Sequence, residues 1–211
     1  MSDESSQHQV IETLMKDLSH KDATKHRSAR EALVEIGRPA VPHLTKALLT
    51  GKDWTRWESA KALGEIGDAE AVPALVEALR EKSFDVRWLA AKGLINIGWR
   101  SITPLIESLI QHADSVWMRD GSHHVLHALS HGQFNEPLQP IIKSLEGVEP
   151  AVEIPHVGRT VLEELKPIEY QIIEKEEEAR RQAEEEAEQA AAEAKLENDL
   201  EARLQKEPCP D

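Results

Sequence analysis

The chain has 211 residues, of which 40% are apolar, and a formal net charge of −14. This length allows one or two domains. The start of the chain lacks the pattern of a signal peptide, and no apolar run approaches the roughly 20 residues that span a bilayer, so we expect a cytoplasmic protein without a membrane segment. The single cysteine, Cys209, excludes an intramolecular disulfide and a cysteine-based zinc cluster.

The negative charge is concentrated at the C-terminal end. From Ile168 onward there are 15 acidic and 6 basic residues, a balance of −9, against 24 acidic and 19 basic residues before it, a balance of −5. A protein that binds nucleic acid normally presents a basic stripe, because much of its affinity comes from neutralising phosphates. The sequence shows no such stripe, which argues against nucleic acid as a partner.

Three stretches of the chain are near-copies of one another, and they begin at Glu31, Lys61 and Lys92. Their glycines recur about every 30 residues, which is typical of a tandem array of one helical hairpin. These glycines, expected to end helices, are Gly37, Gly67 and Gly98. Repeats of this kind bury their apolar faces only by stacking, and they leave a continuous surface that usually holds another molecule.

Each repeat is predicted to contain two helices. The first helix begins at a proline, Pro42, Pro73 or Pro104, because the first helical turn has no use for the missing N–H. Its apolar residues have the spacing of a buried stripe: Leu44, Leu48, Leu49, Leu75, Val76, Leu79, Leu105, Ile106 and Leu109. The second helix turns small residues and one leucine inward, which lets neighbouring helices approach closely: Ala29, Ala32, Leu33, Ala60, Ala62, Leu63, Ala90, Ala91 and Leu94.

Residues 84–91, Phe-Asp-Val-Arg-Trp-Leu-Ala-Ala, are similar to the HEAT-repeat pattern Asp-x-Val-Arg-x-x-Ala-Ala. Over about residues 11–166 the chain resembles HEAT-repeat proteins, in the short form also found in phycobilisome lyases. The resemblance implies an all-α, right-handed α-solenoid of about five helical hairpins, which we place at residues 1–167.

The arginine of the family's repeat pattern corresponds to Arg56, Arg87 and Arg119 in this sequence. His26 and Pro155 stand at that position in the first and last repeats. The resemblance implies that this arginine forms a structural ladder with turn aspartates. Only Asp85 has the matching spacing, so the implied ladder is incomplete here.

Counting from this arginine predicts which residues share the concave face, which the second helices line in such arrays. The position one residue later holds Trp57, Trp88 and Asp120, and the position five residues later holds Lys61, Lys92 and His124. Tryptophans ringed by charge are typical of interaction sites. The alternative is that both tryptophans are ordinary core between repeats.

Two further tryptophans, Trp54 and Trp117, come just before the arginine and are expected to be packing caps in the turn. The fourth repeat departs most from the pattern, because it places four histidines, His123, His124, His127 and His131, in nine residues, and it also contains Gly121 inside its second helix. A mid-helix glycine costs about 1 kcal/mol relative to alanine, which indicates that this repeat is specialised.

The same helix carries histidines four residues apart, at His123, His127 and His131. Imidazoles one turn apart can bind zinc, nickel or copper, and they form a candidate half-site for a metal such as zinc, nickel or iron. The alternatives are a pH-sensitive contact or packing against the next repeat. One HEAT-repeat enzyme, deoxyhypusine hydroxylase, takes its iron ligands from His-Glu pairs, and this sequence contains no His-Glu dipeptide.

The C-terminal part begins with a degenerate fifth repeat. Its helices are expected at residues 136–145 and 158–165, separated by a link through Pro150 and Pro155. Residues 168–207 lack glycine and proline and predict a long charged helix, followed by a disordered tail at residues 208–211. The seam of this helix is alanine apart from Leu196, Leu200 and Leu204, which favours a monomer or a weak dimer over a stable coiled coil.

The sequence contains no phosphate-binding loop, nucleophile elbow or Cys-His pairing, which favours a non-catalytic protein. The prediction is a scaffold or adaptor that binds a protein or peptide on its concave face. One alternative is a lyase-like or chaperone-like accessory that stacks a planar cofactor, such as a tetrapyrrole, on Trp57 and Trp88. The other is a histidine-rich metal-binding protein.

Overall fold

The computed structural model describes residues 2–204, and the side chains of residues 6–195. This part of the chain forms helices joined by short turns and contains no strand. The α-helices are α1 (Ser2–Leu18), α2 (Ala23–Ile36), α3 (Val41–Thr50), α4 (Asp53–Ile66), α5 (Val72–Ala78), α6 (Phe84–Ile97), α7 (Ile102–Gln111), α8 (Val116–Leu129), α9 (Asn135–Glu146) and α10 (Pro150–Leu204). The prediction of an all-α solenoid of helical hairpins followed by a long C-terminal helix is confirmed.

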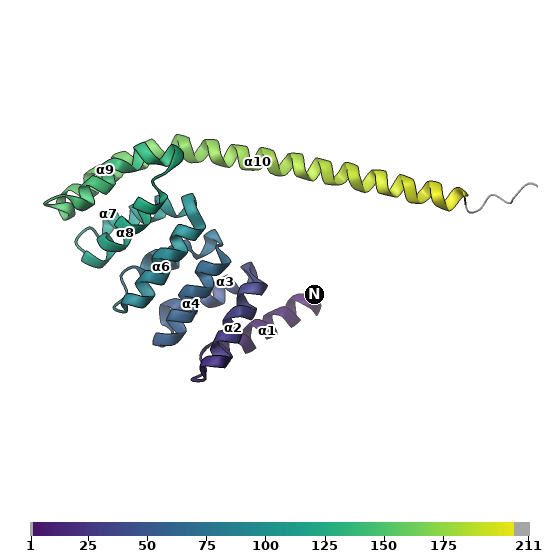
Figure 1. Ribbon diagram of the computed structural model, residues 1–211, viewed down its shortest axis with the longest axis horizontal. Coiled ribbons are helices and arrows are strands. Elements are labelled where there is room, and N and C mark those ends of the chain that lie inside the picture. The colour runs from purple at the N-terminus through teal and green to yellow at the C-terminus, as the bar shows by residue number, and fades with distance from the viewer. Residues whose placement is uncertain (1, 205–211) are drawn as a thin grey trace, which may run out of the picture. The chain divides into compact units, whose positions relative to one another are not determined.

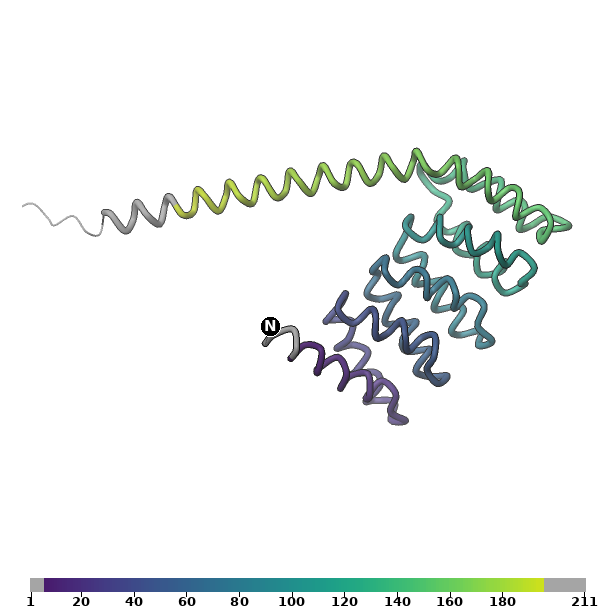
Figure 2. The backbone as a smooth tube through the Cα atoms, turned by 180° about the vertical axis from the view of Figure 1, so that it is seen from behind, coloured from purple at the N-terminus to yellow at the C-terminus, as the bar shows by residue number. Residues whose placement is uncertain are grey.

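The helices of the repeat region form two layers. The second helices of successive repeats, α2, α4, α6 and α8, lie side by side in one layer, and the first helices form the other (Figures 1 and 2). The second helices approach each other most closely where α4 meets α6. A Cβ atom built on Gly64 would lie 3.0 Å from the Cα of Gly93, so the two glycines bring the helix backbones into contact.

The core lies between the two layers and follows the apolar stripes predicted from the sequence. Ala60, Leu63, Ala90 and Leu94 of the second helices are fully or almost fully buried. The predicted stripe residues of the first helices are also buried, with the exception of Leu49, which is exposed. Leu49 directly follows the buried Leu48 and lies about 100° further round α3, on the side that faces solvent.

The predicted helix-ending glycines are confirmed at Gly37, Gly67 and Gly98. Their φ angles are 73°, 70° and 83°, in a region that side chains with a Cβ rarely adopt. In each case the glycine N–H donates to a leucine carbonyl four residues earlier and so closes the last helical turn. The second helices α2, α4 and α6 therefore end at the same point of the repeat.

Arg56 of the repeat pattern donates to the carboxylate of Asp53 at 2.8 Å, whereas Arg87 and Arg119 hold their turns by a different route from the one implied by the resemblance. Arg87 donates to the carbonyl oxygens of Glu81 and Lys82, at 2.7 and 3.0 Å, and not to the carboxylate of Asp85. Arg119 donates to the carbonyl of Ala113 at 2.6 Å. Arg87 and Arg119 satisfy carbonyls of the turns that precede α6 and α8, which supports a structural role.

The C-terminal helix differs from the expectation. In place of a link through Pro150 and Pro155 and a separate helix over residues 168–207, α10 runs without interruption from Pro150 to Leu204. Pro150 begins the helix, where proline is tolerated, and each later proline leaves only one carbonyl four residues earlier without its N–H donor. The carbonyl four residues before Pro155 belongs to Ala151, an exposed residue, so water can replace the donor there.

By its internal contacts the chain divides into two units, residues 1–165 and 166–211. The side chains of residues 174–195 in the second unit are all exposed. The leucine line at Leu196, Leu200 and Leu204 and the tail at residues 208–211 lie outside the part whose side chains are described. Among the helices that the structure describes, none is long and apolar enough to cross a membrane.

Candidate binding face on the second helices

The predicted face residues lie on three neighbouring second helices. Their positions are Trp57 and Lys61 on α4, Trp88 and Lys92 on α6, and Asp120 and His124 on α8. Within each pair the residues are four apart and therefore share one side of their helix. We call the surface that these six residues occupy the second-helix face.

The two tryptophans of this face differ in accessibility. Trp88 is 46% exposed, and its ring stacks on the imidazole of His124 with 4.9 Å between ring centroids. Trp57 is half-buried, and the ammonium group of Lys61 lies 5.2 Å from its ring centroid. Trp88 is therefore open to a partner, whereas Lys61 covers part of Trp57.

A pocket of about 220 Å³ opens between α6 and α8, and we call it the aromatic pocket. Its lining residues are Phe84, Arg87, Trp88, Ala91, Trp117, Asp120, Gly121 and His124. The floor is low because Ala91 and Gly121 are small, and a Cβ atom on Gly121 would lie 3.0 Å from the buried side chain of Leu79. Gly121 thus allows α8 to pack closely against Leu79.

The walls of the aromatic pocket are more exposed than the sequence suggested. Trp54 and Trp117, which were expected to be packing caps, are 38% and 41% exposed. Trp117 joins the pocket wall, and the guanidinium of Arg87 lies 4.8 Å from its ring centroid and 5.7 Å from that of Phe84. Sequence reasoning missed Phe84 and Trp117 as site residues because they precede the counted positions. Their signal was the clustering of aromatic residues in the first turns of α6 and α8.

A second hollow, which we call the lysine groove, lies between α4 and α6 and has a volume of about 510 Å³. Its lining residues are Lys61, Gly64, Glu65, Leu89, Lys92, Gly93, Ile95 and Asn96. Glu65 contacts Arg30 at 3.5 Å, whereas Lys92 has no ion-pair partner among the side chains of residues 6–195. The groove therefore offers the ammonium group of Lys92 to an incoming carboxylate.

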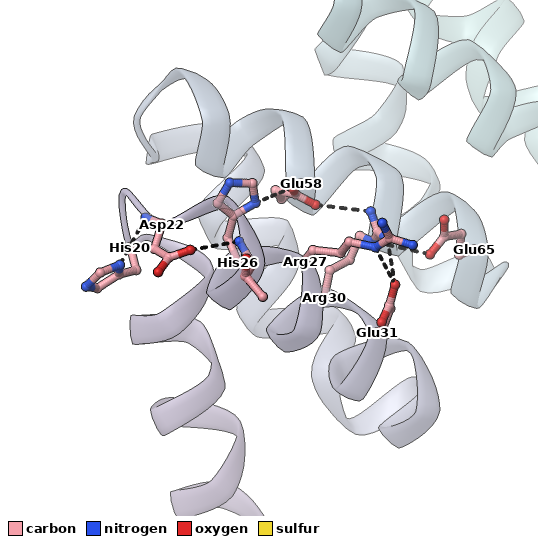
Figure 3. Close-up of polar contacts among 9 residues, drawn as sticks. His20, Asp22, His26, Arg27, Arg30, Glu31, Glu58 and Glu65 are labelled. Atoms are coloured by element: carbon pink, nitrogen blue, oxygen red, sulfur yellow. Dashed lines mark hydrogen bonds and ion pairs between the residues drawn. The ribbon is translucent and has the colours of Figure 1, made fainter.

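The interface between α2 and α4 has a different character. Glu58 is 2% exposed. Its carboxylate oxygens lie 2.5 Å from Nδ1 of His26 and 3.3 Å from Nη1 of Arg30 (Figure 3). Arg30 is 6% exposed and also faces Glu65 and Glu31, at 3.5 and 3.6 Å. A buried carboxylate is tolerated only when it is paired, so this cluster ties the first repeat to the second.

Two carboxylates at the edge of this cluster have lowered pKa values. A hydrogen bond from Arg27, 2.9 Å away, lowers the pKa of Glu31, and Arg27 in turn has a raised pKa. The backbone N–H of Thr24 donates to Asp22 at the start of α2 and lowers the pKa of that carboxyl group. The carboxyl groups of Asp22 and Glu31 are both exposed, so they titrate in contact with solvent.

The three histidines predicted as metal ligands, His123, His127 and His131, make different contacts. His123 Nε2 lies 2.9 Å from a carboxylate oxygen of Glu146, and His131 Nδ1 lies 3.2 Å from the carbonyl oxygen of Ala128. The ring centroids of His123 and His127 are 6.0 Å apart. In the part of the chain that the structure describes, no three His, Cys, Asp or Glu side chains come together as a metal site. Metal binding by these histidines stays a prediction.

Comparison with protein families gives a match to the model described as HEAT repeats. It covers residues 11–94 and, in an overlapping match, residues 42–127, which together span more than half of the chain. The chain belongs to the HEAT-repeat family. HEAT repeats generally act as protein-interaction scaffolds, and nothing in the match is specific to the phycobilisome-lyase form. A search of curated proteins finds no match.

The matched region contains every residue of the second-helix face, so this face is built entirely from HEAT repeats. Helix α9 and the first part of α10 follow the same two-helix plan beyond the matched region. Trp88, Trp117 and Gly121, which line the aromatic pocket, lie at the junction between the repeats of α6 and α8.

Proposed function

We propose that this HEAT-repeat protein is a non-catalytic scaffold that binds a partner polypeptide on its second-helix face. The observation that carries this proposal is the aromatic pocket, in which the exposed rings of Phe84, Trp88 and Trp117 surround a small open volume. Exposed aromatic clusters beside charged groups are typical of the anchor points of protein interfaces. Lys61 and Lys92 favour an acidic or amphipathic segment whose apolar side chain enters the pocket.

The size of the aromatic pocket favours a side chain over a planar cofactor. Pockets that bury drug-sized ligands usually measure about 300–1,000 Å³, and this pocket, at about 220 Å³, is smaller. A tetrapyrrole is larger than a drug fragment, whereas one large apolar side chain fits such a volume. The pocket therefore supports the scaffold proposal better than the lyase-like alternative.

Affinity capture from a native lysate tests the proposal. The wild-type protein is compared with the double variant Trp88→Ala/Trp117→Ala, and bound polypeptides are identified by mass spectrometry. The matched control is Trp54→Ala, which removes an exposed tryptophan that does not line the pocket. We expect a partner that the double variant loses and the control keeps, with unchanged helical circular dichroism in all three proteins.

The proposal fails if the double variant captures the same polypeptides in the same amounts as wild type. A visible absorption band on the purified wild-type protein, lost in the double variant, would instead favour the planar-cofactor alternative.

A further inference from the structure

The second-helix face carries a row of basic residues whose third member changes charge with pH. The position five residues after the repeat arginine holds Lys61 on α4, Lys92 on α6 and His124 on α8. These three helices are successive neighbours in one layer, so the three positions follow one another across the face (Figure 1). Lysine is charged throughout the physiological range, whereas histidine gains and loses its charge between pH 5 and 8. We call these three residues the basic row.

The basic row is open to a charged partner. None of its three residues has an ion-pair partner among the side chains of residues 6–195. Lys92 and His124 are exposed, and Lys61 is half-buried over the ring of Trp57. In the first repeat the same position holds Glu31, which Arg27 pairs at 2.9 Å. The row therefore begins at Lys61, and its charges are available to carboxylates of another chain.

The groups around His124 determine what its protonation does. Its ring stacks on Trp88 of α6, with 4.9 Å between ring centroids, and Asp120 lies one turn earlier on α8. An imidazolium is attracted both by the face of an indole ring and by an aspartate four residues before it in a helix. Arg87 and Lys92 of α6 are the cations nearby, and their charges do not change in this pH range.

The remaining titratable groups of α8 belong to its other neighbour. His123 faces Glu146 of α9 at 2.9 Å, and the ring of His127 lies 6.0 Å from that of His123. Helix α7 packs against α8 from the layer of first helices and contributes no residue to the pocket that His124 lines. His124 is therefore the histidine of α8 that acts on the second-helix face.

The charge of the face rises when His124 is protonated. Its six residues include two lysines and one aspartate, so their formal charge is +1 with a neutral His124 and +2 with a charged one. On α8 itself the change is from one negative charge, that of Asp120, to none. A carboxylate that crosses from α4 to α8 is therefore repelled at α8 when His124 is neutral, and this repulsion disappears on protonation.

We propose that the partner segment is acidic, lies along the basic row across α4, α6 and α8, and binds more tightly as His124 becomes protonated. Lys61 and Lys92 attract the segment at every physiological pH, and His124 makes the α8 end of the contact depend on pH. This inference rests on the proposed function, because it gives the charge of the polypeptide that the second-helix face binds and the regulation of that binding.

Fluorescence anisotropy at pH 7.5 and pH 5.5, in low salt, tests the inference on the full-length protein. The probe is a labelled synthetic peptide with a central leucine flanked by aspartates, which stay ionised over this range. A matched peptide with lysines in place of the aspartates is the control probe. The protein variants are His124→Lys, which completes the row of lysines, and His124→Gln, which removes the titratable charge. His131→Gln, which changes an exposed histidine beyond the end of α8, is the matched control.

We expect wild type to bind the aspartate peptide about two- to fivefold more tightly at pH 5.5 than at pH 7.5, as suits one added charge at an exposed site. His124→Lys should bind at pH 7.5 about as tightly as wild type binds at pH 5.5. His124→Gln should bind weakly at both pH values, and His131→Gln should behave as wild type. All four proteins should have the same helical circular dichroism.

Three results would overturn the inference. The first is that the lysine peptide binds as well as or better than the aspartate peptide at both pH values. The second is that the aspartate peptide does not bind at either pH. The third is that His124→Gln keeps the pH dependence of wild type. If the polypeptide captured from the lysate still depends on Trp88 and Trp117, the scaffold proposal survives each of these results, and only the acidic, pH-dependent mode of binding is rejected.

Discussion

The α2–α4 and α6–α8 interfaces join consecutive second helices in the same way, yet one is closed by charge and the other is left open. The position two residues after the repeat arginine holds Glu58 on α4 and Gly121 on α8. Glu58 is buried against His26 and Arg30, whereas Gly121 forms the floor of the aromatic pocket. The same repeat position thus holds a buried ion pair at the α2–α4 interface and lines an open pocket at the α6–α8 interface.

Between these two interfaces, α4 and α6 show what the repeat does without either device. There Ala60 and Leu89 stand where the α2–α4 interface has Arg30 and Glu58. Close packing of Gly64 on Gly93 holds this junction together. The comparison indicates that the repeat plan needs only small and apolar residues for stacking, and that Glu58 and Gly121 are additions to it.

The largest effect is expected from breaking the ionic cluster. Glu58→Gln leaves Arg30 buried without its innermost carboxylate, and breaking a buried pair in this way should lower the free energy of unfolding by about 3 kcal/mol. Urea denaturation followed by circular dichroism measures the change. The matched control Glu31→Gln removes an exposed carboxylate from the same cluster and should have a much smaller effect.

A double variant sharpens this prediction. Arg30→Ala/Glu58→Leu installs the residue types of the α4–α6 interface, and replacing a buried ion pair by apolar residues is often neutral. The double variant should therefore be more stable than Glu58→Gln. If instead it is the less stable of the two, the charges themselves, rather than their pairing, are required at this interface.

A smaller loss is expected where α4 and α6 touch. The Cβ of Gly93→Ala would lie 3.1 Å from the Cα of Gly64, and a backbone atom cannot move aside as a side chain can. The clash should lower the free energy of unfolding by about 1–3 kcal/mol, although alanine is intrinsically the better helix former by about 1 kcal/mol. Urea denaturation measures it, and a stabilised Gly93→Ala protein would show that the helices can separate without cost.

Substitution of Arg87, which holds the turn before α6, should destabilise the protein more than substitution of an exposed residue in the pocket wall. Arg87→Lys keeps the positive charge but loses the planar guanidinium that reaches two carbonyls and stacks between Phe84 and Trp117. We expect a loss of about 1–2 kcal/mol in the free energy of unfolding. Phe84→Ala is the control, and its thermal midpoint should shift less because Phe84 is 66% exposed.

The smallest effect concerns pH at the start of α2. Asp22 caps this helix by accepting the N–H of Thr24, and its pKa is lowered in the folded protein. A carboxyl group with a lowered folded pKa stabilises the protein above its unfolded pKa, and this stabilisation is lost as the pH falls through the folded pKa. Asp22→Ala should therefore lower the thermal midpoint at neutral pH, and the difference from wild type should shrink on acidification. A difference that is the same at neutral and strongly acidic pH would contradict the capping role.

The sequence by itself determined the repeat plan of this protein. Its period of about 30 residues placed the helices, the helix-ending glycines such as Gly67, and the buried stripes, because these depend on local backbone freedom and on which residues must leave water. The same counting placed Trp88 and Lys92 on one side of α6. These features repeat along the chain, so one sequence contains several copies of the signal.

The tertiary structure decided what happens between repeats. It exposed Trp117 in a pocket wall rather than in a packing cap, paired Glu58 with His26 and Arg30, gave His123 a partner in Glu146, and continued α10 through Pro155. The side-chain pairings join residues that are 23 to 32 positions apart in the sequence. Such contacts occur once in the molecule and have no period, so only the packed helices reveal them.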